Sequence, residues 1–244
     1  MVSVLAATDR FAAFTSQHYL LLVIFAVGCV LVPMWGRSHR GTDRELLARR
    51  GSAVAVALVG LGMQGYQLTP NDFDLGTSLP LALCDLATAA AVIGLWSRSP
   101  RATAFTYYAG LTLTIQGVLT PSLGESFPHP RFFGFWALHF LVIWAAVYLV
   151  WGLGVRPTWR LYAFTVAVTA TWAAAVYVFN VLAETNYGYL NEKPSSASLL
   201  DLMGPWPWYV FVEIAVVAIS WAVVLTLPWY VVGRSSRAQG PDPA

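Results

Sequence analysis

A cysteine and a histidine are the residues of this sequence whose types could support nucleophilic catalysis. Cys84 follows SLPLAL at the expected start of a helix and directly precedes Asp85. A thiol becomes a nucleophile when a base takes its proton, and a helix N-terminus favours the thiolate. His139, in FWALHFLVI, has the side chain that most often acts as such a base. The pair therefore predicts nucleophilic chemistry if both side chains face one cavity.

Other polar side chains, most of them at a similar depth within apolar segments, are expected to support the pair. They are Gln64, Asp85, Gln116, Asn180, Asn186 and Glu213. At 1.5 Å per residue, the members inside the apolar segments lie about 3–12 Å below one membrane boundary. Because an ionisable group in hydrocarbon is costly unless it faces a bundle interior or water, we expect an outward-opening polar pocket. Asn180 and Gln116 are candidate oxyanion donors, and Asp85 or Glu213 is a candidate to orient the imidazole.

Each of these residues also has a structural interpretation, which the sequence leaves open. Glutamine and asparagine in membrane spans often bridge helices, and Glu213 could pair with His139 or Arg131. A lone cysteine in a span, such as Cys29, is usually a small hydrophobic residue. No metal site or cofactor is expected, because H-x-x-x-H, C-x-x-C and P-loop patterns do not occur.

The elements that must position these side chains are membrane-spanning helices. The 244 residues are 57% hydrophobic and 11% charged, with a mean hydropathy of +0.61. Apolar stretches predict an all-α, polytopic bundle of seven transmembrane helices. The predicted spans are 17–35, 51–68, 79–96, 103–120, 131–153, 160–182 and 207–232. We expect one domain over 1–232 and a short disordered cytoplasmic tail over 233–244.

Charge asymmetry between the loops predicts the orientation. The segment from Arg37 to Arg50 carries five arginines, whereas TPNDFDLGTS has Asp72 and Asp74 and no basic residue. The positive-inside rule then places the N-terminus outside and the C-terminus in the cytoplasm. The excess of arginine over lysine, with abundant alanine and valine, favours a bacterial plasma membrane. A net charge of +2 without a long basic run makes nucleic acid an unexpected partner.

Several segments resemble a known family. They are LPLALCDLAT (79–88), IQGVLTPSLGE (115–125), FWALHFLVI (135–143) and, most specifically, FNVLAETNYGYLNEKPSSASLLDLMGPWPWYV (179–210). Over about residues 50–230 the chain resembles the YwaF-like bacterial integral membrane proteins, which are grouped with animal transmembrane protein 164. The resemblance implies a multi-span helical fold, similar also to the androgen-induced hydrolases of fatty-acid esters. It also implies acyl transfer onto lysophospholipids, with Cys84 and His139 at the positions of the family's cysteine and histidine.

The leading hypothesis is therefore a lipid acyltransferase or acyl-lipid hydrolase that uses Cys84 as nucleophile and His139 as general base. Its expected partners are membrane lipids, such as a lysophospholipid or an acyl donor lipid. One alternative is a small-solute transporter, and another is a non-catalytic lipid-binding or partner-binding membrane protein.

Overall fold

The computed structural model describes residues 11–121, 123–194 and 198–231, which form helices and loops and contain no strand. Five helical segments are long and apolar enough to cross a membrane by length and composition. They are α1 (Ser16–Ser38), α2 (Asp43–Gln67), α6 with the π-helical η2 (Pro130–Gly152), α7 (Trp159–Ala183), and Trp208–Val231, which begins with α8 (Trp208–Ser220) and η5 (Trp221–Thr226). The prediction of an all-α membrane protein is confirmed.

Two of the predicted spans have a different form in the structure. The stretch 79–96 begins with turns, so that its helix, α3 (Leu83–Ser97), is apolar but shorter than the five long segments. The stretch 103–120 is divided into α4 (Pro100–Ala109), a π-helical turn η1 (Gly110–Thr114) and α5 (Ile115–Leu119). The count of seven spans and the predicted orientation of the termini remain predictions.

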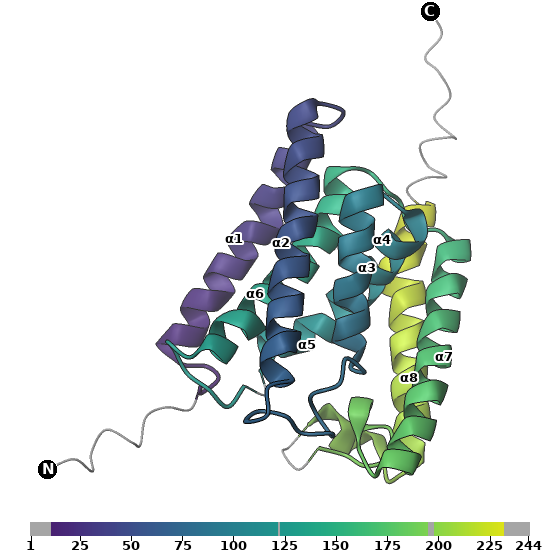
Figure 1. Cartoon of the computed structure of the whole chain (residues 1–244). Coiled ribbons are helices and arrows are strands. Elements are labelled where there is room, and N and C mark those ends of the chain that lie inside the picture. Colours follow the sequence, from purple (N-terminus) through teal and green to yellow (C-terminus); the bar gives the residue numbers. More distant parts are fainter. Residues whose placement is uncertain (1–10, 122, 195–197, 232–244) are drawn as a thin grey trace, which may run out of the picture. The chain divides into compact units, whose positions relative to one another are not determined.

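The chain groups into two compact units, drawn with their helices in Figure 1. Unit 1 contains α1 to α6, η1 and η2, and its described residues lie within 11–72 and 84–155. Unit 2 contains α7, η3 (Tyr187–Tyr189), η4 (Leu199–Met203), α8 and η5, and its described residues lie within 73–83 and 156–231. The single domain predicted for 1–232 stays a prediction, and the predicted tail 233–244 lies outside the described residues.

Helix α6 is the centre of unit 1. In its most apolar window 61% of the residues are buried, compared with 11% in α1. Phe132, Trp136 and Phe140 follow one another at a spacing of four, and they join Phe11 in one buried cluster. Residues at this spacing lie on one face of a helix, which explains why the cluster is continuous. Helices α1, α2, α4 and α5 all pack against α6.

The N-terminal end of α1 is attached to α5 by a buried histidine. Nδ1 of His18 accepts a hydrogen bond from the backbone N–H of Phe14, and Nε2 donates to the carbonyl of Val118, each at 2.9 Å. Both ring nitrogens are therefore satisfied, and the neutral imidazole fits a site with no exposed surface. His18 thus has a structural role.

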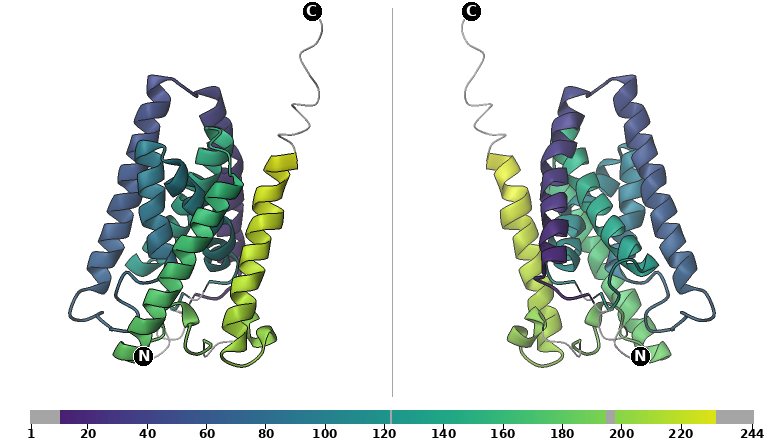
Figure 2. Two further views of the ribbon diagram at one scale, coloured as in Figure 1. Left: turned by 90° about the vertical axis from the view of Figure 1, so that its right-hand side faces the viewer. Right: turned by 90° about the vertical axis from the view of Figure 1, so that its left-hand side faces the viewer.

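Helix α2 begins at Asp43, eight residues before the predicted start at 51. Its N-cap is Thr42, whose hydroxyl accepts a hydrogen bond from the backbone N–H of Glu45. The charged stretch before residue 51 therefore continues the helix instead of forming a loop. Helices α1 and α2 meet at their short connection over 39–42 and then diverge (Figure 2).

In unit 2, side chains of α7 hold the segment 73–83 and helix α8. The hydroxyl of Tyr187, just after α7, accepts from the backbone N–H of Leu79 at 2.9 Å and donates to the carbonyl of Leu75 at 2.8 Å. Trp172 donates through Nε1 to the carbonyl of Leu81 at 2.9 Å. Tyr162 donates to a carbonyl of α8 at 3.3 Å. Tyr187 and Trp172 thereby hold the segment 73–83, and Tyr162 holds α8.

Candidate functional site

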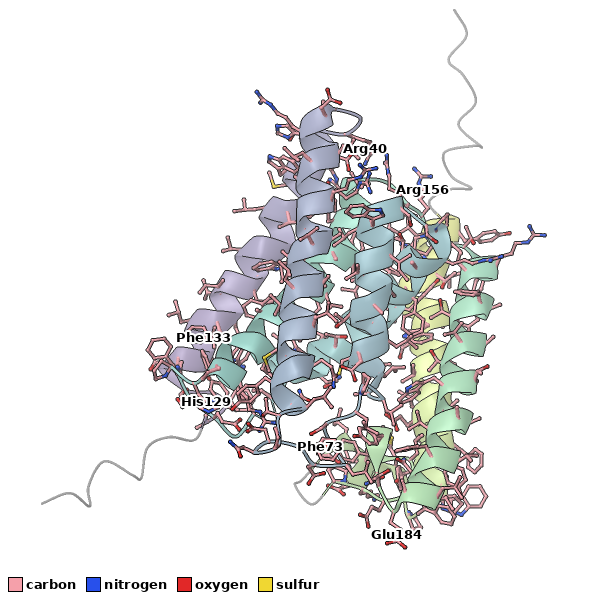
Figure 3. The ribbon with its side chains drawn as sticks, viewed as in Figure 1. Arg40, Phe73, His129, Phe133, Arg156 and Glu184 are labelled. Carbon is pink, nitrogen blue, oxygen red and sulfur yellow. The ribbon has the colours of Figure 1, made fainter. Side chains whose placement is uncertain are left out.

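The candidate catalytic residues lie in unit 1, whose two ends differ in composition. Figure 3 shows His129 and Phe133 at one end of this unit and Arg40 at the other. Helix α6 starts directly after His129, so that depth along the unit can be counted from that end. We call these the His129 end and the Arg40 end.

His139 lies on α6 in one defined protonation form. Its Nδ1 is 2.7 Å from the carbonyl oxygen of Phe135, one helical turn earlier. A carbonyl only accepts, so Nδ1 must carry the proton, and in the neutral imidazole Nε2 then carries the lone pair. In the described part of the chain no hydrogen bond is made to Nε2. His139 is therefore held in the form that a general base requires.

The ring of His139 is positioned by a glycine on α5. A Cβ added at Gly117 would overlap Nε2 of His139, so that only glycine lets α5 approach the ring at this point. Gly117 follows Gln116, a candidate oxyanion donor whose side chain is exposed. Gly117 thus brings a bare backbone position against the imidazole.

Cys84 lies in the first turn of α3, and its side chain is exposed. One turn later, the hydroxyl of Thr88 donates to the carbonyl of Cys84 at 2.8 Å. The methyl group of Thr88 faces Gly60 of α2, where an added Cβ would be 3.2 Å from Thr88 and 3.7 Å from Leu138 of α6. Helices α2, α3 and α6 therefore meet at one level.

This junction relates the depths of the cysteine and the histidine. His139 directly follows Leu138, and Cys84 precedes Thr88 by four residues, which corresponds to about 6 Å along α3. The two residues consequently differ in depth by about 7.5 Å, or nearly one and a half helical turns. No hydrogen bond joins them within the described ranges. Gln64 lies one turn from Gly60 on α2 and is half-buried, as is Asp85.

Two predicted pocket residues have structural partners in unit 2. Asn180 is buried; its side-chain N–H groups donate to the carbonyl of Tyr187 at 2.9 Å and to Oδ1 of Asn191 at 3.0 Å. Its Oδ1 accepts from Thr185 and from the backbone of Tyr187. Asn186 likewise bonds to the backbone of residues 191 and 192. In this arrangement neither amide hydrogen of Asn180 is available to an oxyanion.

The carboxylates expected near the site have different surroundings. Glu213 is half-buried on α8, and within unit 2 no described residue forms a hydrogen bond or ion pair with it. Arg131, one of the partners considered for Glu213, pairs with Glu125 at 3.0 Å instead. Among the residues described, no group of three or more metal-ligating side chains could hold a metal ion.

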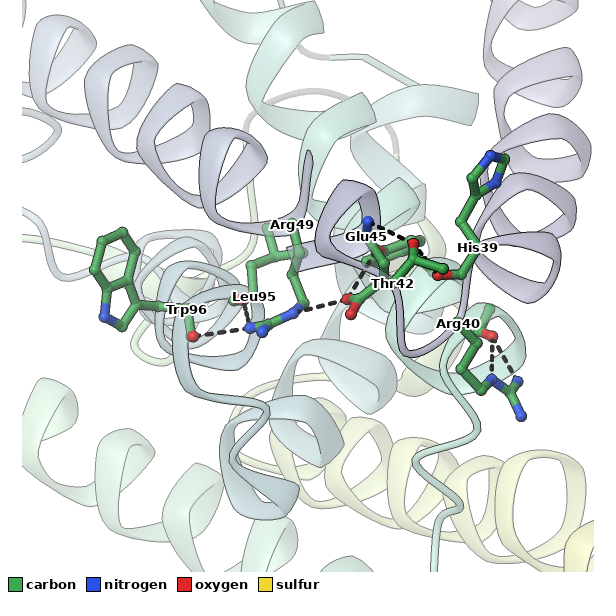
Figure 4. A network of polar contacts seen from close by, with 9 residues as sticks. His39, Arg40, Thr42, Glu45, Arg49, Leu95 and Trp96 are labelled. Atoms are coloured by element: carbon green, nitrogen blue, oxygen red, sulfur yellow. Dashed lines mark hydrogen bonds and ion pairs between the residues drawn. The ribbon is translucent and has the colours of Figure 1, made fainter. Parts of the chain in front are cut away.

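Sequence reasoning missed a buried polar network at the Arg40 end, drawn in Figure 4. Nε of Arg49 is 2.9 Å from Oε1 of Glu45, and the same carboxylate oxygen accepts from the hydroxyl of Tyr148 at 3.2 Å. Arg49 also donates to the carbonyls of Leu95 and Trp96 at the end of α3. The sequence did contain a signal for this network. TDRE (42–45) matches the pattern of a helix N-cap, and Glu45 and Arg49 are four residues apart, the spacing of an ion pair on one helix.

Comparison with known proteins gives one match. No curated protein and no solved structure matches the chain. A family model described as the TMEM164 family matches residues 13–225, which is most of the sequence. This match agrees with the resemblance to transmembrane protein 164 that the segments around Cys84, His139 and Asn180 carry. The chain belongs to the TMEM164 family.

Proposed function

We propose that this membrane protein is a lipid acyltransferase or acyl-lipid hydrolase in which Cys84 is the nucleophile and His139 the general base. The observation that carries the proposal is the hydrogen bond from Nδ1 of His139 to the carbonyl of Phe135. It leaves the basic Nε2 without a partner in the described part of unit 1, in the same unit as the exposed thiol of Cys84. Membership of the TMEM164 family agrees with this assignment.

The proposed reaction has two steps. Cys84 loses its proton to Nε2 of His139, and its sulfur attacks the carbonyl carbon of an acyl ester. The ester C–O bond breaks, the leaving alcohol takes the proton from His139, and the acyl group remains as a thioester. A second alcohol then attacks the thioester carbon and gives its proton to His139; the C–S bond breaks, and His139 returns the proton to the sulfur of Cys84, which completes transfer, whereas water in the role of the alcohol completes hydrolysis.

Oxyanion stabilisation is assigned to the α5 side of the site. The exposed amide of Gln116 is the candidate donor, because both side-chain N–H groups of Asn180 are already bonded. Asp85, directly after Cys84, is the candidate to orient the imidazole. Substrate binding must bring the thiol and Nε2 into hydrogen-bond reach, and apo sites commonly tighten in this way.

The proposal includes the arrangement in the membrane. The chain crosses it seven times, with the N-terminus outside and the C-terminus in the cytoplasm of a bacterial cell. Lipids are then the substrates, with an acyl donor lipid and a lysophospholipid as donor and acceptor. Their acyl chains lie among the apolar helices, and the reacting ester lies at the level of Cys84.

The experiment is an acyl-transfer assay with purified protein in nanodiscs that contain a phospholipid with deuterated acyl chains and an unlabelled lysophospholipid. Mass spectrometry of the lipids measures transfer and free fatty acid, and intact-mass measurement detects an acyl adduct on the protein. We expect Cys84→Ala to abolish both products and the adduct. The matched control is Cys29→Ala, which removes the other thiol, at a half-buried position on α1.

Full activity in Cys84→Ala overturns the mechanism. We expect His139→Gln to lower the rate by about 10²–10⁴-fold, the usual contribution of a general base. This loss should be smaller for acyl donors with good leaving groups, which need less proton transfer. An equal loss with every donor assigns His139 a structural role and overturns its part of the proposal.

A further inference from the structure

Unit 1 contains a cavity of about 330 Å³ between α1, α2, α3 and α6. Ligand pockets in proteins have volumes of about 300–1,000 Å³, so that this cavity is large enough for a small molecule or part of a larger one. Its floor includes the buried side chains of Val56, Leu95 and Ala145, and its rim includes the exposed residues Leu31 and Trp35. It is thus a cavity with a buried interior and an accessible mouth.

The cavity is apolar, and its lining on α6 begins at Leu141, two residues after His139, and continues away from it. Its lining contains no charged side chain, and its polar side chains are Ser52, Tyr148 and the indoles of Trp35 and Trp144. The hydroxyl of Tyr148 already donates to Glu45. Leu95 lies about 16 Å beyond Cys84 along α3 at 1.5 Å per residue, and Tyr148 about 13 Å beyond His139 along α6. The interior therefore fits a hydrocarbon chain.

One exposed arginine lies on α2 one turn before the lining residues, toward the Arg40 end. Ala48, Ser52 and Val56 line the cavity at a spacing of four on α2, and one turn earlier on this face is Arg44. Arg44 is exposed and forms no ion pair with any residue that the structure describes. On α1, Trp35 stacks on His39, with ring centroids 4.4 Å apart. The face of α2 that lines the cavity thus continues to an exposed arginine that has no ion pair among the described residues.

We infer that this cavity holds one acyl chain of an anionic phospholipid, with the lipid phosphate bound by Arg44. This inference does not depend on the proposed acyl transfer, because neither Cys84 nor His139 lines the cavity. The lipid is a bound ligand at this site and undergoes no reaction there.

A membrane phospholipid fits this site better than a soluble amphiphile does. The rim residues belong to α1 and α2, which are both long and apolar enough to span a membrane, so that the mouth opens to lipid. A chain can then enter from the bilayer while its phosphate stays at the interface, where Trp35 is a residue typical of that depth. Near a membrane surface, one arginine contributes about fivefold to binding of an anionic lipid.

The test is photolabelling in nanodiscs with a phosphatidylglycerol that carries a diazirine on one acyl chain, with a phosphatidylcholine probe in parallel. Peptide mapping reports the labelled positions. We expect phosphatidylglycerol to label the buried residues Val56 and Ala145, which lipid at the outer helix surface does not reach. Ser52→Leu should abolish this labelling by filling the mouth, and Arg44→Gln should lower the apparent affinity about fivefold.

Matched controls separate the site from general effects on the protein. The control for Ser52→Leu is Val54→Leu, which adds bulk to an exposed position of α2 outside the cavity. The control for Arg44→Gln is Arg156→Gln, which removes one exposed cation elsewhere. Neither control should change the labelling. Thermal unfolding identifies any variant that no longer folds. Three outcomes would each overturn the inference. They are equal labelling by phosphatidylcholine, labelling by a diazirine fatty acid alone, and unchanged labelling in Ser52→Leu. Unchanged affinity in Arg44→Gln overturns the assignment of the phosphate.

Discussion

The imidazole of His139 lies against Gly117, so closely that a Cβ on residue 117 would overlap Nε2. The nitrogen that carries the lone pair thus faces the backbone of α5, while Nδ1 is bonded within α6. The position of the proposed base depends on the absence of a side chain on a neighbouring helix. The φ of Gly117 lies outside the left-handed region, so its backbone conformation does not require glycine. The close approach of the His139 ring does require it.

Gly117→Ala should displace the ring of His139. Inserting a methyl group into packed structure costs about 1–3 kcal/mol, which should lower the melting temperature in detergent. It should also reduce acyl transfer by moving Nε2. Gly62→Ala on α2 is the control, because a Cβ there meets no atom within 4 Å. In that variant alanine should stabilise the helix by about 0.5–1 kcal/mol. Equal stability of both variants would contradict the close contact.

Removal of one charge from the buried pair Glu45 and Arg49 should be strongly destabilising. Both side chains are almost inaccessible, so Glu45→Gln leaves the guanidinium without its counter-ion and should cost about 3–5 kcal/mol. Replacement of both by leucine should cost less than either single change, because no buried charge then remains. Denaturant unfolding measures the difference. A double variant as unstable as the sum of the single variants would be evidence against a coupled pair.

Tyr187→Phe should loosen the segment that precedes α3. Its hydroxyl accepts from the N–H of Leu79 and donates to the carbonyl of Leu75, and both backbone groups lose this partner in the variant. A lost buried partner costs about 1–3 kcal/mol. Hydrogen exchange over 73–82 should therefore accelerate. Tyr177→Phe on α7 is the control, because its exposed hydroxyl forms no hydrogen bond with the residues described. Unchanged exchange in Tyr187→Phe would show that other contacts hold the segment.

The candidate site could be predicted only in part, and Asn180 shows why. Its depth near the end of an apolar stretch is visible in the sequence, and so is the polar sequence that follows it. Its hydrogen bonds to Tyr187 and Asn191 depend on how the chain turns back after α7, which spacing does not reveal. The same limit applies to His139, since both a bonded and an unbonded Nδ1 are compatible with its sequence context.

Local composition by itself determined that the chain forms apolar membrane helices, because roughly 20 apolar residues must satisfy their backbone hydrogen bonds within one helix in lipid. It did not determine which helix is central. The most apolar window of α1 has a mean hydropathy of 2.3 and is 11% buried, whereas that of α6 has 2.0 and is 61% buried. Lipid tails are as apolar as a protein interior, so hydropathy does not separate a lipid-facing helix from a buried one. Only the tertiary packing around α6, with the Glu45 and Arg49 pair at one end and Gly117 against His139, decided that arrangement.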